Sequence, residues 1–360
     1  MYFGLSAEQE QLQETVRSFI AGECPPARRR KLFEAGTGCD GSLWAGMAEI
    51  GLTALLIPES YGGTELGILD LALVCEVAGA EALPGPLLEH SLACLALVDA
   101  GSTEQKQRWL PKLASGELIG TLALAEEVDA WEPESWTATE ANGLLAGRKA
   151  YVPNAASAGL VVVGIRGGGL AVAETKDAPG LAFQDQYGID RGRPIGRLCF
   201  ESTPCQILPG GREASRRLLD AGLAALAADS HGAATRLIAL SAEYSQDRKQ
   251  FGFPIAQFQA VKHQIARIGT DIEPTRALFW YAAHALDRQL ADASRAAAMA
   301  KAHITDRAMH AAREAVELHG GLGFTWECDV QLWFKRAMFN RAFLGSPAEH
   351  RERCAVLAGW

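Results

Sequence analysis

The sequence predicts an α+β protein built from a helical N-terminal part, a middle β part and a C-terminal helical bundle. Apolar residues recur with a helical period over the first part of the chain, short Val/Ile/Leu runs follow, and long Ala/Leu-rich segments complete it. The composition, with 48% hydrophobic and 21% charged residues, is that of an ordinary globular protein. The expected domains are residues 1–117, 118–210 and 211–360.

The N-terminal domain begins with an amphipathic helix at about residues 6–22. Ser6 and Gln9 have the spacing of a capping box. The same apolar period recurs over residues 43–57, 68–82 and 87–100, and clusters of Gly, Pro, Ser and Thr separate these segments. We therefore expect residues 1–117 to be entirely helical.

The middle domain is predicted from a change of pattern after Gly116. Four short apolar runs are separated by Gly, Asn, Asp and Pro, as strands are separated by turns. These runs are LIGTLALAEE, GLLAGRKAYVPNA, AGLVVVGIRGGGLAVAET and PIGRLCFESTPCQIL. A small β domain over residues 118–210 is expected.

The C-terminal domain returns to the helical period in long segments, and Gly320 and Gly321 follow the third of them as a helix stop. Long helices in succession favour a four-helix bundle. The expected helical segments are 213–248, 257–290, 293–318, 327–344 and 347–357.

Charge and cysteine usage exclude several classes of function. The formal net charge of -9 gives no attraction for phosphate backbones or anionic membranes, so neither nucleic acid nor membrane is an expected partner. The eight Cys residues are scattered without a CxxC pair, so no metal site is predicted. The chain has neither a signal-peptide pattern nor a long uncharged apolar span. A cytoplasmic protein with reduced thiols is expected.

Three segments, in order along the chain, resemble signatures of the acyl-CoA dehydrogenase family. They are MAEIGLTALLIPESYGGTELG (47–67), RKQFGFPIAQFQ (248–259) and ELHGGLGFTWECDV (317–330). Together with TEQKQRWLPKLASGELIGTLALAE (103–126), they make the resemblance extend over essentially the whole chain. It implies the fold already predicted, the cofactor FAD and an acyl-CoA thioester as substrate.

The resemblance also implies a set of residues that hold the ADP part of an FAD whose ring lies in a neighbouring subunit. Arg248 offers a guanidinium fork for a pyrophosphate, Phe251 a flat apolar face and Gln259 an amide. Gly320–Gly321 lets backbone N–H groups approach a diphosphate closely. Glu317 stands where the family usually has Gln, which replaces an amide donor by a carboxylate.

The catalytic base of the family is missing from both of its known positions. The reaction removes an α-proton while a hydride passes to the flavin, so it requires a carboxylate. Most members carry a Glu at the position that Leu344 occupies here, and a minority carry it at the position of Gly222. Asp220 would point away from the face that Gly222 presents, and Asp229 lies two helical turns further on. No catalytic residue is therefore assigned.

Three further departures affect the flavin ring and the thioester. The family's LDxxR segment reads LDAGL, with Leu223 at the Arg position, and its flavin-side loop appears as AEEVDAWEP (125–133) without the usual Thr, Gly and Ser. The Trp-Ile-Thr segment appears as Tyr151-Val152-Pro153. Pro153 offers neither a hydroxyl nor an N–H group.

Three functional hypotheses follow. In the first, the chain is a non-catalytic subunit of an α2β2 acyl-CoA dehydrogenase and completes the FAD site of a catalytic paralogue, which holds most of the acyl-CoA. Family members of this mixed kind imply a steroid side-chain substrate. In the second, a self-sufficient homotetramer uses a relocated base such as Asp220 or Asp229. In the third, the fold serves as a scaffold that binds nucleotide or CoA without turnover.

Overall fold

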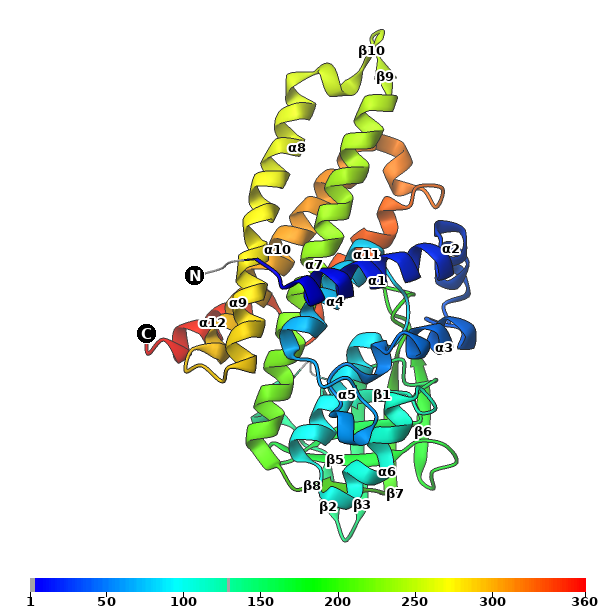
Figure 1. The fold of residues 1–360 in the computed structure, drawn as a ribbon, viewed down its shortest axis with the longest axis vertical. Helices are drawn as coiled ribbons and strands as arrows, with labels where there is room; N and C mark the ends of the chain where they lie inside the picture. Colours follow the sequence, from blue (N-terminus) through cyan, green and yellow to red (C-terminus); the bar gives the residue numbers. More distant parts are fainter. Residues whose placement is uncertain (1–3, 128–129) are drawn as a thin grey trace. The chain divides into compact units, whose positions relative to one another are not determined.

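The computed structural model describes residues 4–127 and 130–360, without the side chains of residues 211–213 (Figure 1). Contacts divide the chain into two compact units. Unit 1 comprises the N-terminal segment ending at Ile20, Ala72–Leu83 and Leu223–Trp360. Unit 2 comprises Ala21–Leu71 and Pro84–Gly222. The division into the three domains 1–117, 118–210 and 211–360 stays a prediction.

Unit 2 contains two four-stranded sheets. The first has the order β1-β4-β5-β8, with β1 parallel to β4 and the other pairs antiparallel. The second is antiparallel and has the order β2-β3-β7-β6. The strands are β1 Gly120–Ala123, β2 Thr139–Ala141, β3 Leu144–Pro153, β4 Leu160–Ile165, β5 Gly169–Glu174, β6 Leu181–Gln186, β7 Ile195–Pro204 and β8 Gln206–Leu208.

Both sheets share one apolar core, because every second residue of their strands points inward. Leu145 and Val152 of β3 meet Val161 and Val163 of β4 in this core, with Phe200 of β7. Helix α5 covers β1 and β4 (Figure 1). The helices within unit 2 are α2 Pro26–Ala35, α3 Gly41–Glu49, α5 Leu87–Ala100 and α6 Thr103–Ala114, with short 3-10 turns η1 Leu52–Ala54, η2 Glu59–Tyr61 and η3 Pro133–Ser135.

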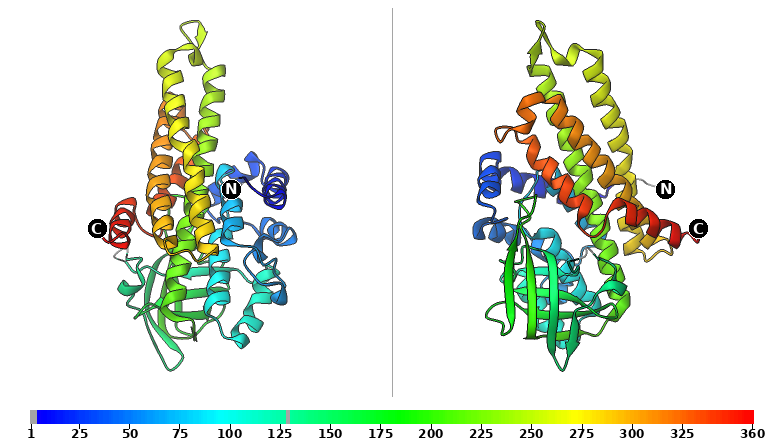
Figure 2. Two further views of the ribbon diagram at one scale, coloured as in Figure 1. Left: turned by 60° about the vertical axis from the view of Figure 1, so that its left-hand side comes forward. Right: turned by 180° about the vertical axis from the view of Figure 1, so that it is seen from behind.

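Unit 1 is helical apart from one small hairpin. Its helix α10 contacts α8, α9, α11 and α12 and so lies at the centre of the bundle (Figure 2). The elements are α8 Gln259–Ile272, α9 Arg276–Asp287, α10 Ala293–Leu318, α11 Val330–Ala342 and α12 Pro347–Leu357, with β9 Lys249–Gln250, β10 Phe253–Pro254, η4 Ile255–Gln257, η5 Glu273–Thr275 and η6 Gly320–Phe324. Helices α1 Ala7–Glu23, α4 Ile68–Ala80 and α7 Gly211–Asp247 contribute residues to both units.

The core of unit 1 depends on a close crossing of α4 and α7. A Cβ on Gly79 would collide with the carbonyl of Asp229, and a Cβ on Gly232 would collide with the carbonyl of Glu76. Because each helix presents a glycine to the backbone of the other, the two helix axes approach closely.

The predicted fold class is confirmed, with helices, then β sheets, then a helical bundle in chain order. The segment 43–57 is not one helix, because α3 ends at Glu49 and Gly51 turns the chain with a φ of 80°. The segment 257–290 is also interrupted, at Pro274, by the 3-10 turn η5. Helix α2 was not predicted from the sequence, although Pro26 in its first turn and Gly36 at its C-cap are typical of a helix.

The described part of the chain includes no helix that combines the length and apolar character needed to span a bilayer. Nor do the residues with assigned positions gather three or more His, Cys, Asp or Glu side chains into a group that could hold a metal ion.

We predict that Gly232→Ala destabilises the protein. The added methyl group would meet the Glu76 carbonyl, so the free energy of unfolding should fall by about 1–3 kcal/mol. The matched control is Gly269→Ala in α8, where a Cβ meets nothing within 4 Å and a small stabilisation is expected. Urea unfolding of both variants measures the difference, and equal effects would contradict the close helix crossing.

Candidate functional site

The residues expected to hold ADP lie at one end of unit 1, beginning with a tight hairpin. β9 and β10 pair Gln250 with Phe253, and the two residues between them, Phe251 and Gly252, have φ values of 52° and 84°. Two positive φ values in a two-residue loop define a type I′ turn, which favours Asn or Gly and strains an aromatic residue. Phe251 is 89% exposed, and its ring makes an edge contact with the Phe258 ring, with the centroids 6.2 Å apart.

Arg248 is placed beside this hairpin by the backbone. Its carbonyl accepts a 2.8 Å hydrogen bond from the Ile255 N–H group, which closes the hairpin at its base. Its side chain is exposed, and no partner for its guanidinium is found in residues 4–127 and 130–360. The guanidinium is therefore available to an anion.

A ring stack joins the end of α7 to the end of α10. Tyr244, four residues before Arg248, stacks on His319 with ring centroids 4.4 Å apart, and its hydroxyl lies 3.4 Å from the His319 carbonyl. His319 is directly followed by Gly320 and Gly321. The pKa of His319 is lowered by burial, which favours the neutral ring that stacks here. The stack brings Arg248 and the glycine pair to the same end of the bundle.

Gln259 and Glu317 lie at this end as well. Helices α8 and α10 run antiparallel, because Gln264 hydrogen-bonds Glu314 near one end and Arg307 lies 3.6 Å from Asp271 towards the other. The start of α8 therefore lies near the end of α10 (Figure 1). Both Gln259 and Glu317 are exposed.

The structure gives a different explanation for the glycine at each of the three positions in the GGLG segment. Gly323 is required by packing, since a Cβ there would approach the Val316 carbonyl at 2.5 Å. Gly320 has a φ of 60°, which favours glycine. Gly321 has neither reason, because a Cβ would meet nothing within 4 Å. Its surface is open, as close approach by a ligand from outside requires.

Leu344, at the usual position of the family base, is 2% exposed and has a φ of 60°. The turn around it is held firmly. The buried Lys301 ammonium donates to the carbonyls of Gly345, at 2.8 Å, and Arg341, at 3.2 Å, and His350 contacts the Leu344 carbonyl at 2.8 Å. An aliphatic side chain in this buried, strained turn cannot accept a proton.

The alternative base positions are engaged in structural roles. Gly222 and Leu223 are buried in α7. Asp229 is fully buried, and its carboxylate accepts from Asn340 at 2.6 Å and pairs with Arg336 at 3.3 Å. Asp220 is buried as well, within the electrostatic influence of Arg216. A carboxylate that is buried and satisfied in this way is a poor proton acceptor for a substrate.

The loop at 125–133 belongs to unit 2, and its residues 128 and 129 lie outside the described residues. Ion pairs bind its described carboxylates to the sheet and to α7. Glu126 pairs with Lys149 at 2.5 Å, Glu127 with Arg197 at 3.4 Å, and Glu132 with Arg216. Glu126, Glu127 and Glu132 are therefore held by contacts with their own chain.

The Lys149–Glu126 pair lies deep in unit 2. The Lys149 ammonium is fully buried, donates to the Leu124 carbonyl at 2.6 Å and lies 5.5 Å from the Trp136 ring. Burial lowers the pKa of Lys149 to about 8, although hydrogen bonding to Glu126 acts in the opposite direction.

Trp131 fills the space beside Tyr151. Tyr151 lies in a β-bulge of β3 with a φ of 55°, and its ring is 6.2 Å from that of Trp131. Trp131 is buried, and its carbonyl accepts from the Trp136 indole N–H at 3.2 Å. Pro153 ends β3 in a buried position. The large side chains of Trp131, Trp136 and Tyr151 thus lie close together in and beside the loop 125–133.

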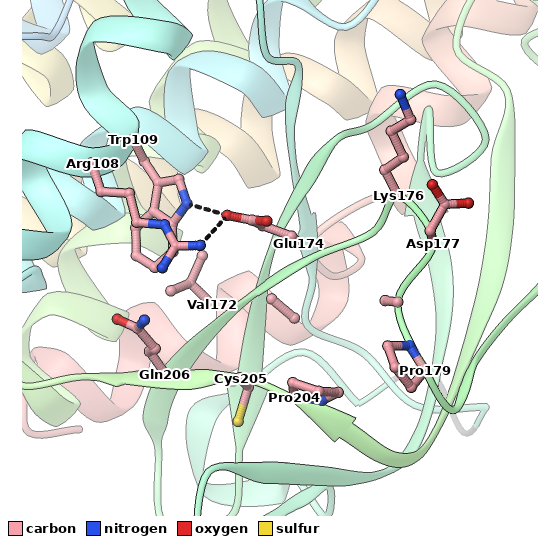
Figure 3. Close-up of a pocket in the computed structure, with 12 residues that line it drawn as sticks. Arg108, Trp109, Val172, Glu174, Lys176, Asp177, Pro179, Pro204, Cys205 and Gln206 are labelled. Carbon is pink, nitrogen blue, oxygen red and sulfur yellow. Dashed lines mark hydrogen bonds and ion pairs between the residues drawn. The ribbon is translucent and has the colours of Figure 1, made fainter.

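A surface cleft of about 300 Å³ lies elsewhere in unit 2, between α6, β5 and β8 (Figure 3). Glu174 crosses it and accepts from Arg108 at 2.8 Å and from the Trp109 indole at 3.0 Å. Because none of the residues expected to bind ADP lines this cleft, it is not the site sought here.

The order of a helical part, two β sheets and a helical bundle defines the architecture of a flavin-dependent acyl-CoA dehydrogenase, and comparisons with known proteins agree. Residues 6–117 match the model of the acyl-CoA dehydrogenase N-terminal domain, and residues 209–356 match that of the C-terminal domain. The chain belongs to the acyl-CoA dehydrogenase family.

Two relatives named acyl-CoA dehydrogenase IpdE2 are similar over nearly full length. The protein of Mycolicibacterium smegmatis is 32% identical, and the match covers 97% of this chain and 98% of the relative. The protein of Mycobacterium tuberculosis is 34% identical, and the match covers 95% of this chain and 94% of the relative. A variant of the Tcur3481–Tcur3483 steroid ACAD is a similar solved structure, with a TM-score of 0.91, 30% identity and 98% coverage of both chains.

We predict that the Lys149–Glu126 pair makes stability depend on pH. Because folding lowers the pKa of Lys149 to about 8, the unfolded chain binds more protons between pH 8 and the usual lysine range near pH 10.5. The free energy of unfolding of the natural chain, relative to Lys149→Met/Glu126→Leu, should rise by up to about 1.4 kcal/mol per pH unit in this window. Urea unfolding across the window measures this, and a constant difference would contradict it.

Proposed function

We propose that this chain is a non-catalytic subunit of a heteromeric, α2β2 acyl-CoA dehydrogenase and that it completes the FAD site of a catalytic partner subunit. The observation that carries the proposal is a contrast within the chain. The groups suited to ADP, led by Arg248 and Gly321, are exposed and have no role inside the described chain. The positions suited to the flavin ring and to proton abstraction are buried or filled.

The residues at the hairpin end of unit 1 fit the ADP part of FAD. Arg248 would pair with the pyrophosphate, the open backbone at Gly320 and Gly321 would donate N–H groups, and Phe251 would pack against the adenosine. Bound FAD would supply the hydride acceptor of the partner's reaction. Glu317 would face this anion with a carboxylate, so an opposing cation of the partner subunit is expected there.

The residues on the other side fit the flavin ring poorly. Trp131 and Trp136 are buried in unit 2, and Glu126 of the loop 125–133 pairs with Lys149. Leu344 offers no base. These features support the proposal that this chain does not bind a flavin ring in its own pocket.

The substrate of the proposed complex is an acyl-CoA thioester held mainly by the partner. One similar structure supports a bulky, steroid-type acyl group, since it is named the Tcur3481–Tcur3483 steroid ACAD. The two alternatives remain open to test: a self-sufficient enzyme would carry flavin and act alone, and a scaffold would lack flavin with and without a partner.

Arg248→Ala tests the proposal directly. In the purified complex, loss of a charge-assisted contact to phosphate should weaken FAD retention roughly 10- to 100-fold, because such contacts contribute about 1.5–3 kcal/mol. The control is Arg267→Ala, an exposed position along α8 away from the hairpin. Flavin absorbance after dialysis measures retention. Unchanged flavin content in Arg248→Ala would remove this chain from the FAD site.

Leu344→Glu should not give activity to the chain by itself. The new carboxylate would be buried, and the loop beside Tyr151 would still hold Trp131. Acyl-CoA-dependent bleaching of flavin in the variant without its partner is the measurement. Bleaching would favour the self-sufficient enzyme.

A further inference from the structure

A buried histidine lies at the crossing of α4 and α7 and takes no part in the candidate ADP site. His231 of α7 directly precedes Gly232, where an added Cβ would collide with the Glu76 carbonyl of α4. The His231 side chain is fully buried, and its ring centroid lies 5.5 Å from that of Phe279. Histidine ordinarily titrates between pH 5 and 8, so a buried histidine at a helix crossing is a candidate pH sensor.

Hydrogen bonding decides which ring nitrogen of His231 carries the hydrogen. The Thr275 hydroxyl donates its single proton to the Ile272 carbonyl at 2.7 Å, so it accepts from the His231 Nδ1, which lies 2.9 Å away. Nδ1 therefore carries the hydrogen, and Nε2 presents a lone pair. Nε2 has no hydrogen-bond partner within residues 4–127 and 130–360. It is the atom at which His231 would take up a proton.

The lone pair of Nε2 lies beside the carboxylate of Glu76, whose Oε1 is 3.6 Å away. That carboxylate already accepts from two donors, the Gln13 amide at 2.8 Å and the Arg276 Nε at 3.1 Å. Gln13 also donates to the Leu73 carbonyl at 3.2 Å. Because Gln13 belongs to α1 and Arg276 to α9, one carboxylate of α4 ties both helices together beside α7.

The charges around His231 disfavour a further proton. Arg276 already balances the carboxylate of α4, and it also pairs with Glu273 of η5 at 3.2 Å. On α7 itself, Asp229 pairs with Arg336 of α11. Helices α8 and α10 contribute apolar side chains to the core that they share with α7. Burial, together with the charge of Arg276, lowers the pKa of His231 to about 3.

We propose that His231 is an acid-sensitive latch for the N-terminal helix: when Nε2 takes up a proton, the crossing opens and α1 is released from the bundle. A protonated Nε2 would place a second cation beside Arg276 and would compete with it for the Glu76 Oε1. Exposure of His231 to water removes both effects, so a proton favours the open arrangement. The latch is closed above pH 6.5, the ordinary pKa of histidine, and closure is lost as the pH falls from there towards 3.

The test is hydrogen–deuterium exchange of the full chain, with His231→Asn as the variant. Asn keeps a donor near Thr275 and does not titrate. If opening takes up one proton, the exchange rate of α1 in the natural chain, divided by that in the variant, should rise about tenfold from pH 7 to pH 5.5. Carboxylates ordinarily titrate below this window.

Two further variants serve as controls. His231→Gln fills more of the buried space and gives the same comparison if the Asn variant folds poorly. His310→Asn, a matched change at a half-buried position of α10, should show no change with pH in the exchange of α1 relative to the natural chain.

Two results would overturn the inference. One is a ratio for α1 that stays constant from pH 7 to pH 5.5, because opening would then take up no proton at His231. The other is an equal rise in peptides from β3 and β7 of unit 2, because acid would then unfold the whole chain rather than release α1. A rise confined to α1 and to the part of α4 beside it supports the latch, whether or not the chain proves to hold FAD.

Discussion

The stack of Tyr244 on His319 is the contact on which the candidate ADP site depends. It fixes the end of α7 against the end of α10, and the hairpin with Arg248 and the turn with Gly320 extend from those two ends. Burial lowers the pKa of His319, and its imidazole Nδ1 lies 2.7 Å from the Ala315 carbonyl one turn earlier. The stack thus joins groups some 70 residues apart in sequence, and the apolar core of Ala234, Ile268 and Leu318 packs the same helices together.

The positions expected to hold ADP and the positions expected near the flavin ring and the base differ in exposure. At the hairpin end, strain and exposure are retained: Phe251 keeps a positive φ although it is 89% exposed, and Gly321 keeps an open backbone. In unit 2 and around Leu344, the side chains at the corresponding positions make contacts inside the protein. Glu126 pairs with Lys149, and Trp131 and Leu344 are buried. Strain that persists without an internal reason is expected where an external partner uses it.

Periodicity was sufficient to predict the order of the layers and the long helices, because α10 buries a regular apolar face. Helix α12 begins at a capping box formed by Ser346 and Glu349. Periodicity failed where a single residue overrides the pattern, as Gly51 does after α3 and Pro274 does between α8 and α9. The edge strand β6 was missed because its side chains are largely exposed and so do not alternate. The residues of the candidate site were found through family motifs, whereas the Tyr244–His319 stack and the burial of Trp131 depend on tertiary contacts that no local pattern encodes.

In the proposed complex, this chain lends its ADP-holding groups to a partner and holds no flavin ring itself. The most direct measurement is the flavin content of the complex obtained by co-expression with an acyl-CoA dehydrogenase paralogue that retains its base. We expect two FAD per four chains and no flavin on this chain purified alone. Four FAD per tetramer, or a yellow protein that acyl-CoA bleaches in the absence of any partner, would contradict it.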